Sequence, residues 1–348
     1  MEGTLTTDSV MFRIFSPDIA IDLGTANTLV YTKGRGICLN EPSMVAIRED
    51  GSQRRVVAIG AEAKKMLGRT PEGIKVLRPM RAGVIADFET AGTMLDYFLR
   101  AAEQKRFSLI KPRIVVGIPA SITEVEKRAI RDSGQNVGAR EVRLIDEAMA
   151  AALGCGLPVT EPVGSLIVDI GGGTTDIAVI SLKDIIYANS LRLGGDAMDE
   201  AIIQYVRREH RVLIGEATAE LIKMTIGTVH PKGDKQEVQV KGRSLTDGHP
   251  ATITISAREV RIALEDVMSS IITGVRSALE AVPPEVAGDI VEYGICLTGG
   301  GALIGNIALR FAEEFKLPIH VPDDPLTAVV MGAGKCLDNE ELYRELLF

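Results

Sequence analysis

The chain has 348 residues, of which 46% are hydrophobic and 25% charged, enough to build about two domains of roughly 150 residues each. It contains no run of about 18 or more apolar residues, so the sequence predicts no membrane-spanning helix. The net charge of −8 argues against a protein that works by coating nucleic acid. The four cysteines, Cys38, Cys155, Cys296 and Cys336, lie far apart and predict reduced thiols, with neither a zinc site nor a disulfide framework.

Strands and helices alternate through the first half of the sequence. Apolar runs predict strands at 19–23, 28–31, 36–39 and 113–118, and helical spacing predicts helices at about 86–103 and 122–137. Ser121, with Glu124 three residues later, has the capping-box pattern and is expected to begin the second helix. Asp146 is the expected N-cap of an Ala-rich helix at 148–153.

The second half repeats this alternation. A hairpin is predicted at 166–180, a strand at 186–193, and helices at 198–209 and about 257–281. Alternating polar and apolar residues at 230–250 predict short exposed strands. The two halves therefore indicate an α/β protein with mixed sheets.

One turn occurs twice, as IDLGTANT at Ile21 to Thr28 and as VDIGGGTTDIAV at Val168 to Val179. Each copy is an apolar strand that ends in an Asp, then a Gly/Thr-rich turn, then a second apolar strand. Glycine lets backbone N–H groups converge on an anion, and the Thr hydroxyls add donors. One such turn is weak support for a phosphate site, because Gly-rich hairpin turns are common, but repetition points to duplicated units. The pair predicts two phosphate loops that hold one nucleotide.

A third Gly-rich segment, ICLTGGGALI at Ile295 to Ile304, is again a strand that runs into a glycine triplet, and a helical pattern at 306–315 follows it. Neither the Walker pattern G-x-x-x-x-G-K-[ST] nor a G-x-G-x-x-G that opens a helix ahead of a well-placed acid is present. Any phosphate chemistry must therefore come from the paired hairpins.

These motifs, in this order, resemble those of the actin, sugar-kinase and DnaK-type chaperone superfamily. Within it the chain resembles the MreB family of bacterial actins, from about Pro17 to the C-terminus. The further matching stretches are LNEPS (39–43), RPMRAGVIADF (78–88), LIDEAMAAALG (144–154), GGDAMDEAI (194–202), AELIKMTIGT (219–228) and PPEVAGDI (283–290).

The resemblance implies an actin-like α/β fold, with two ribonuclease H-like domains and the nucleotide in the cleft between them. The first domain would span 17–154, with an inserted subdomain at about 41–73, and the segment 324–348 would pack back onto it. The second domain would span 155–323, with an inserted subdomain at about 191–252. Residues 1–16 would form an N-terminal leader.

The repeated turns predict the phosphate and metal ligands. Asp22 and Asp169 would hold Mg²⁺, through water, against the phosphates of ATP or ADP; the alternative is an Asp that only caps its turn. Backbone N–H groups would cradle the phosphates at Gly24, Thr25, Ala26 and Asn27 and at Gly171, Gly172 and Gly173.

Glu147 is the candidate catalytic carboxylate. By itself an acid in the first turn of a helix indicates stabilisation of the helix dipole. The family resemblance implies that Glu147 orients the attacking water and that Thr174 assists it.

The nucleoside contacts are also implied by the resemblance. Glu220 and Lys223, on the helical stretch that includes Leu221 and Ile222, would contact the ribose and adenine. The base would lie against Gly299, Gly300, Gly301, Ala302 and Leu303. The alternative for Glu220 and Lys223 is an exposed ion pair three residues apart.

Two segments are candidates for contact with a membrane. Phe12 and Phe15 belong to a short apolar cluster in the leader, which could lie in a bilayer interface, although a disordered or core-packing leader is an equal alternative. Phe107, Leu109 and Ile110 are apolar residues flanked by basic ones, which suits an anionic lipid surface.

The expected function is that of an ATP-dependent cytoskeletal protein with slow ATP hydrolysis. By resemblance, it polymerises with itself into filaments on the inner face of the cell membrane, works with the cell-wall elongation machinery and membrane-embedded shape proteins, and determines rod cell shape. The alternatives are an actin for plasmid or organelle positioning and, less favoured, a small-metabolite kinase of the same fold. The sequence does not distinguish ATP from GTP or reveal the filament contacts.

Overall fold

The computed structural model describes residues 18–50, 53–103, 111–120 and 122–348. The chain divides into two units. Unit 1 contains the described residues up to Lys65, together with Pro71–Leu157 and Thr327–Phe348, and unit 2 contains Met66–Thr70 and Pro158–Leu326. Each unit is built on one five-stranded sheet.

The large sheet of unit 1 has the strand order β10-β9-β1-β2-β3. Its strands are β1 (Ile19–Leu23), β2 (Asn27–Thr32), β3 (Gly36–Pro42), β9 (Arg113–Ile118) and β10 (Glu141–Asp146). β1, β2 and β3 form an antiparallel meander, while β9 runs parallel to both β1 and β10. The sheet is therefore mixed, as the strand pattern predicted.

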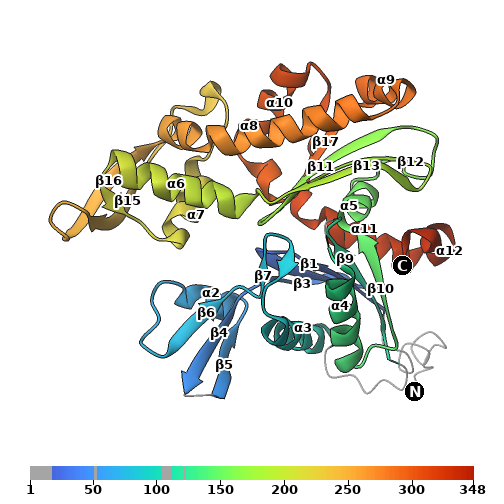
Figure 1. The fold of residues 1–348 in the computed structure, drawn as a ribbon, viewed down its shortest axis with the longest axis horizontal. Helices are drawn as coiled ribbons and strands as arrows, with labels where there is room; N and C mark the ends of the chain where they lie inside the picture. Colours follow the sequence, from blue (N-terminus) through green and yellow to red (C-terminus); the bar gives the residue numbers. More distant parts are fainter. Residues whose placement is uncertain (1–17, 51–52, 104–110, 121) are drawn as a thin grey trace, which may run out of the picture. The chain divides into compact units, whose positions relative to one another are not determined.

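Helices cover both faces of this sheet (Figure 1). α3 (Phe88–Glu103) and α4 (Glu124–Asn136) pack on one face and α5 (Glu147–Gly154) and α11 (Ala328–Asp338) on the other. On the α3 side, Ile19, Ile21 and Leu23 of β1 join one buried cluster with Phe98. Because strand side chains alternate between faces, Asp22 points to the side of α5 and α11.

The start of α4 differs from the prediction. The helix begins at Glu124, and its capping box is formed by Thr123 and Glu126, not by Ser121 and Glu124. The segment SITEVE contains two overlapping capping-box patterns, and the sequence alone does not decide between them. The predicted N-cap of α5 is confirmed, because Asp146 accepts hydrogen bonds from the N–H groups of Ala148 and Met149.

Smaller elements complete unit 1. A second, antiparallel sheet has the order β5-β4-β6, and the hairpin β7–β8 follows it in the chain. The bounds are β4 (Val45–Asp50), β5 (Gln53–Ile59), α2 (Ala61–Met66), β6 (Ile74–Leu77), β7 (Met80–Arg81), β8 (Val84–Ile85), α12 (Glu340–Tyr343) and the 3-10 turn η4 (Arg344–Leu346). The chain passes from the large sheet to the small one after Pro42. It then runs through β7 and β8 to α3, which packs on the large sheet.

The large sheet of unit 2 repeats the topology of unit 1. Its order, β18-β17-β11-β12-β13, again places an antiparallel meander beside parallel strands. The bounds are β11 (Ser165–Ile170), β12 (Thr175–Ser181), β13 (Asp184–Leu191), β17 (Ile295–Thr298) and β18 (Ile319–His320). Strand β11 thus takes the place of β1, and β12 that of β2, so the repeated motif lies in equivalent positions.

One hydrophobic core of unit 2 includes residues of its large sheet, of a three-stranded sheet of order β14-β15-β16 and of the helices. The helices are α6 (Gly195–Glu209), α7 (Glu216–Ile226), α8 (Ala257–Ala281), α9 (Pro284–Tyr293) and α10 (Ile307–Phe315). Figure 1 shows α6 and α8 running from one sheet to the other. The strands are β14 (Val212–Leu213), β15 (Glu237–Ser244) and β16 (Pro250–Ser256), with 3-10 turns η1 (Pro231–Gly233), η2 (Gly300–Leu303) and η3 (Pro325–Thr327). Helix α8 has the predicted bounds.

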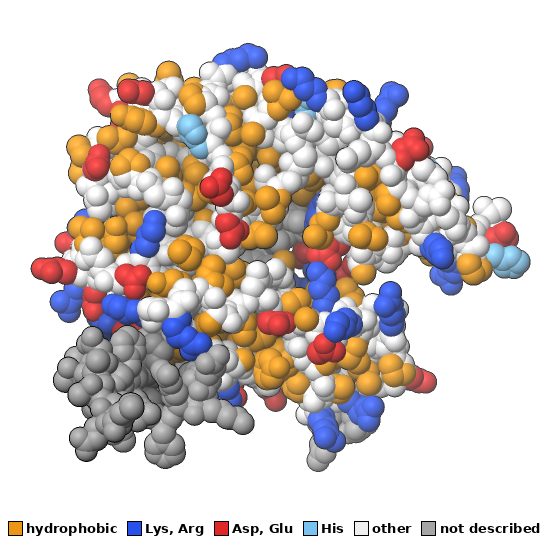
Figure 2. Space-filling model, turned by 180° about the vertical axis from the view of Figure 1, so that it is seen from behind, with side chains coloured by type: hydrophobic (Ala, Val, Ile, Leu, Met, Phe, Trp, Pro, Cys, Tyr) orange, Lys and Arg blue, Asp and Glu red, His pale blue; other side chains and the backbone are white. Residues whose placement is uncertain are grey.

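Charges of both signs are interspersed over the face that Figure 2 shows. Exposed pairs such as Lys65–Glu62 are of the kind that contributes less than about 1 kcal/mol, so the two cores supply most of the stability. No helix among the described residues is both long and apolar enough to cross a membrane.

Candidate functional site

The two Asp residues of the repeated turns lie at equivalent strand ends. Asp22 is the next-to-last residue of β1 and Asp169 the next-to-last residue of β11. In register, Asp22 pairs with Gly117 of the parallel strand β9, and Asp169 pairs with Thr298 of the parallel strand β17. Each turn therefore follows the carboxyl end of a strand with a parallel neighbour, the edge where α/β sheets bind ligands.

The first loop, Gly24 to Asn27, is held by Ser43 at the junction of the two sheets. The Ser43 hydroxyl donates to the carbonyl of Gly24 at 2.7 Å, and the Ser43 N–H donates to the carbonyl of Ala26 at 2.9 Å. A Cβ on Gly24 would lie 2.6 Å from the carbonyl oxygen of Asn27, so the tight turn requires glycine. Both loop carbonyls are thereby drawn toward Ser43.

The two polar side chains of this loop are held in different ways. The N–H of Gly83, at the tip of the β7–β8 hairpin, donates to the hydroxyl oxygen of buried Thr25 at 3.2 Å. That hydroxyl accepts through one lone pair and keeps its own proton to donate. Asn27 is the first residue of β2, and its side-chain amide donates to Asn40 at 3.2 Å.

The second loop, Gly171 to Thr174, closes on itself and is held by α6. The N–H of Gly171 donates to the carbonyl of Thr174 at 2.8 Å. The carbonyls of Gly171 and Gly172 accept from the N–H groups of Gly195 and Asp196, at 3.0 and 2.8 Å. Thr174 is buried, and Gly173 lies in the turn beside it. In both loops, therefore, backbone carbonyls are tied by donors that lie beyond the next two strands of the chain.

The carboxylates at the strand ends lie in surroundings that favour a cation. Desolvation raises the pKa of Asp22 to about 7. In unit 2, Asp169 lies directly opposite Asp176 of β12, and both are buried. Like charges in opposed positions repel, and a bound divalent cation would relieve this repulsion. The residues present therefore fit Mg²⁺, whose preferred ligands are oxygens.

Glu147 is the first residue of α5, next to the N-cap Asp146. Burial raises the pKa of Asp146, although it accepts the two backbone N–H groups of the helix. A Cβ added to Gly117 would lie 3.5 Å from Cγ of Glu147, so the Glu147 side chain lies beside the residue that pairs with Asp22. Within unit 1 the structure thus brings Glu147 and Asp22 to the same end of the same sheet face. Thr174, its predicted assistant, belongs to unit 2.

The four predicted nucleoside residues of α7 have different surroundings. Ile222 is fully buried in the hydrophobic core, so its side chain packs inside the fold, whereas Leu221 is 55% exposed. The ammonium of Lys223 pairs with Asp199 of α6 at 2.9 Å, and the Lys223 side chain is only 17% exposed. The alternative of an exposed Glu220–Lys223 pair therefore does not describe Lys223. Burial raises the pKa of the Asp199 carboxyl to about 6, and the nearby Glu220 adds to this rise.

The third Gly-rich segment packs directly against β11. Gly299 has φ +79°, and a Cβ there would lie 2.3 Å from Oδ1 of Asp169. A Cβ on Gly301 would lie 2.2 Å from the Ile170 side chain. Gly300 and Leu303 are exposed, while Gly301 and Ala302 are buried. The glycines are therefore required for close approach to the strand that carries Asp169.

Five predicted membrane residues lie outside the described residues, namely Phe12, Phe15, Phe107, Leu109 and Ile110.

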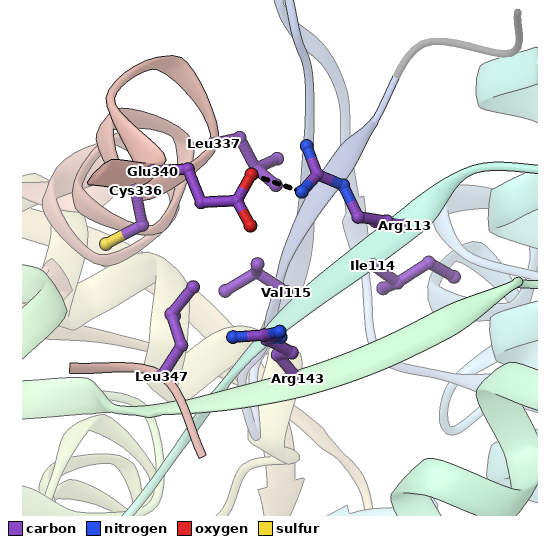
Figure 3. Close-up of a pocket in the computed structure, with 8 residues that line it drawn as sticks. All are labelled: Arg113, Ile114, Val115, Arg143, Cys336, Leu337, Glu340 and Leu347. Carbon is purple, nitrogen blue, oxygen red and sulfur yellow. Dashed lines mark hydrogen bonds and ion pairs between the residues drawn. The ribbon is translucent and has the colours of Figure 1, made fainter. Parts of the chain in front are cut away.

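A small pocket in unit 1 lies away from these loops (Figure 3). Arg113, at the start of β9, forms an ion pair with Glu340 of α12, and its guanidinium also donates to Asp18. Arg143 of β10 donates to Glu141 at 2.7 Å. Because Arg113 begins the strand whose far end carries Gly117, the pocket lies at the opposite end of the sheet from the first loop. Its charged groups connect the C-terminal helix to β9.

The sequence did not single out Ser43, Gly83 or Asp199. Their signal lies in the stretches LNEPS, RPMRAGVIADF and GGDAMDEAI, where each is one polar or glycine residue among several. Only the contacts across the fold distinguish them.

Solved structures resemble the chain over most of its length. MreB5 of Spiroplasma citri bound to ADP is 37% identical with a TM-score of 0.88, covering 94% of this chain and 98% of that one. The same protein bound to AMPPNP gives a TM-score of 0.89, also at 37% identity and with the same coverage. A MamK double helical filament gives 0.78 at 23% identity, covering 92% and 99%. The chain has the actin-like fold, which confirms the predicted fold class.

The family follows from the sequence comparisons. The family model for MreB/Mbl protein matches residues 16–345. The cell shape-determining protein MreB of Escherichia coli (strain K12) is 52% identical over 337 residues, covering 96% of this chain and 97% of that one. The cell shape-determining protein Mbl of Bacillus subtilis (strain 168) is 44% identical over 326 residues, covering 94% and 97%. The chain belongs to the MreB/Mbl family.

Proposed function

We propose that this protein is an ATP-dependent cytoskeletal protein that polymerises into filaments, organises cell-wall elongation and so determines rod cell shape. The single observation that carries the nucleotide part is the pair of Asp-Gly-Thr hairpins in equivalent positions of two sheets of identical topology. Family membership supports the role in shape, because relatives up to 52% identical are named cell shape-determining proteins. The MamK filament supports the view that this fold can assemble.

The proposed ligand is ATP, or ADP after hydrolysis. MreB5, at 37% identity, has been solved with ADP and with AMPPNP. In this chain the carbonyls of both loops are tied back, so the opposite side of each loop is left to present N–H groups to an anion. The N–H of Gly171 is an exception, because it donates to the carbonyl of Thr174 within the loop. Thr25 adds a hydroxyl donor to the first loop, because its oxygen already accepts from Gly83.

Asp22 and Asp169, with Asp176 beside the latter, would hold Mg²⁺ through water. Bound there, the ion would supply positive charge that neutralises phosphate oxygens. A cation would favour the ionised form of Asp22, whose pKa is raised by burial, and would lower the repulsion between Asp169 and Asp176, which face each other.

Hydrolysis requires a water in line with the γ-phosphate and little covalent participation by the protein. Glu147 is proposed to orient this water by accepting its hydrogen bond, with Thr174 as a second polar partner. Asp146 fixes the start of α5 and hence the place from which the Glu147 side chain extends. One carboxylate with backbone donors suits slow turnover, which in a filament acts as a timer.

The nucleoside is proposed to contact Glu220 and the Gly299 to Leu303 segment. Leu303 is 57% exposed on η2, and exposed Gly300 in the same turn carries no side chain that would obstruct a flat base. Leu221, also exposed, extends the apolar part of α7.

Attachment to the inner face of the membrane is proposed from the sequence of the leader and of residues 105–111. Replacing Leu109 and Ile110 by serine should reduce pelleting with anionic liposomes without stopping assembly. Equal pelleting of variant and wild type would remove these two residues from the membrane contact and leave Phe12 and Phe15 for the next test.

The assembly experiment tests the proposal as a whole. The purified full chain is centrifuged at high speed with Mg²⁺-ATP, with Mg²⁺-AMPPNP and without nucleotide, and each pellet is imaged by negative stain. Filaments that depend on nucleotide are the expected result. A protein that binds nucleotide but stays unassembled in every condition would overturn the cytoskeletal proposal and favour a metabolite kinase of the same fold.

A further inference from the structure

The second phosphate loop owes its shape to the first turn of helix α6. The N–H groups of Gly195 and Asp196 donate to the carbonyls of Gly171 and Gly172 at 3.0 and 2.8 Å. The first N–H groups of a helix have no partner within the helix, so here they serve the loop. A third contact, from the Thr175 hydroxyl to the carbonyl of Leu193 at 2.7 Å, joins the loop to the residues before α6.

The backbone of the loop lies so close to the backbone at the start of α6 that the loop has no space to move toward the helix. A Cβ on Gly194 would lie 2.5 Å from the carbonyl oxygen of Gly171 and 2.8 Å from that of Gly172. The backbones therefore touch directly, and any displacement of the first turn of α6 is transmitted to the loop carbonyls.

Lys223 of α7 holds this first turn from the other side. Its ammonium donates to the carbonyl of Gly195 at 2.8 Å and pairs with the Asp199 carboxylate, one turn later in α6, at 2.9 Å. Both side chains are largely buried, at 17% and 12% exposure, so the contacts are only weakly screened by solvent. A chain of contacts of 2.8 to 3.0 Å thus runs from Lys223 through Gly195 to Gly171.

We propose that Lys223 is a positioning residue for the phosphates: with Asp199, it fixes the N-terminal turn of α6, and this turn fixes the carbonyls of the second loop so that its N–H groups face an anion. The inference rests on the proposed function, because it assumes that the second loop binds phosphate. It gives Lys223 a role that differs from the ribose and adenine contact implied by family resemblance.

The two roles predict different ligand dependence. If Lys223 contacts the nucleoside, its loss weakens ATP binding and leaves inorganic tripolyphosphate, which has no nucleoside, unaffected. If Lys223 positions the loop, both ligands lose affinity by the same factor. Loss of a hydrogen bond from a charged group corresponds to a factor on the order of ten or more.

The experiment measures the affinities of the full chain for Mg²⁺-ATP and for Mg²⁺-tripolyphosphate by calorimetry. The variants are Lys223→Met and the double variant Asp199→Asn/Lys223→Met, which leaves no buried charge without its partner and so remains testable where the single variant fails to fold. Lys235→Met is the matched control, because Lys235 is exposed and lies outside this chain of contacts. Lys223→Arg, which keeps the charge, should restore part of both affinities.

Equal losses for the two ligands, of about tenfold or more in the Lys223→Met chains and none in Lys235→Met, are expected. A loss confined to ATP, or no loss at all, would overturn the positioning role while leaving the proposed nucleotide site intact. A wild-type chain that binds neither ligand would overturn the proposed function, and this inference with it.

Discussion

Replacing Gly332 by alanine is expected to force helices α5 and α11 apart. Gly332 lies in the middle of α11, where a Cβ would lie 1.8 Å from the carbonyl oxygen of Ala150 in α5. At the end of α5, a Cβ on Gly154 would likewise lie 1.9 Å from the carbonyl oxygen of Ala328. The two helix backbones are therefore in contact at both points, and glycine is what permits it.

The magnitude follows from this geometry. Real Cβ atoms are essentially never found within 3.0 Å of such atoms, so the helices must separate by more than about 1 Å. Overpacking of this kind costs up to about 3 kcal/mol, and the better helix propensity of alanine returns about 1 kcal/mol. The net loss of about 2 kcal/mol should lower the unfolding midpoint by about 4 to 8 °C.

Thermal unfolding followed by circular dichroism measures this shift, and the chain offers a matched control. Gly288 lies inside α9 with nothing within 4 Å of an added Cβ, so Gly288→Ala gains helix propensity without a clash. Its midpoint should stay the same or rise by about 2 to 4 °C. If Gly332→Ala unfolds at the wild-type temperature, α5 and α11 can separate at no cost and the close contact does not stabilise unit 1.

The remaining predictions concern hydrolysis, the metal, the first loop and pH. Glu147→Ala should retain nucleotide binding and lower phosphate release at least about tenfold, and unchanged turnover would remove Glu147 from the mechanism. Asp169→Ala should weaken Mg²⁺-nucleotide binding itself, and full affinity in a titration would reassign the metal ligand. Ser43→Ala should weaken nucleotide binding on the order of tenfold or less while the midpoint falls by only a few degrees, whereas wild-type affinity would show that the first loop keeps its shape unaided. Arg261 holds the pKa of Asp234 below its usual value, so the pair stabilises the fold above about pH 4 and this contribution is progressively lost as the pH falls below it. The difference in unfolding free energy between wild type and Arg261→Met, measured in urea, should therefore narrow as the pH falls below about 4, and a difference that does not change with pH would contradict it.

Much of the fold could be predicted because its signals are local. Strands β1 and β9 and helix α8 have the predicted bounds, since each is a run of apolar residues with one clear period and clear ends. The start of α4 could not be predicted, because Ser121 and Thr123 offer the same local pattern and only the structure shows that Thr123 is the N-cap. The short β7–β8 hairpin has too few residues for any period.

The geometry of the candidate site was predictable where it depends on a single turn, while the roles of its residues stay predictions. Gly24 and Asp22 fall into this class, because strand, Asp and Gly-rich turn are adjacent in the chain. Lys223 does not, since its partner Asp199 lies on another helix and only the packing of α6 against α7 brings them together. Ile222 is a neighbour of Lys223 in the sequence, but its side chain is buried in the core. Adjacent residues of a helix point to different faces, so a stretch of sequence that contains candidate site residues also contains core residues.

The two units hold the carbonyls of their loops by different kinds of donor. This difference decides which substitutions can disturb each loop. In unit 2 the loop carbonyls are tied by main-chain N–H groups of α6, which no substitution of the donor residues other than proline removes. In unit 1 one of the two ties is the side-chain hydroxyl of Ser43, which a single substitution removes. A side-chain substitution at one residue can therefore remove a tie of the first loop, while side-chain substitutions other than proline reach the ties of the second loop through their support, at Lys223 or at the glycines where helix and loop touch. Among variants that act through these ties, those that weaken nucleotide binding without unfolding the chain should accordingly fall at Ser43 in unit 1, but at Lys223 and Gly194 in unit 2.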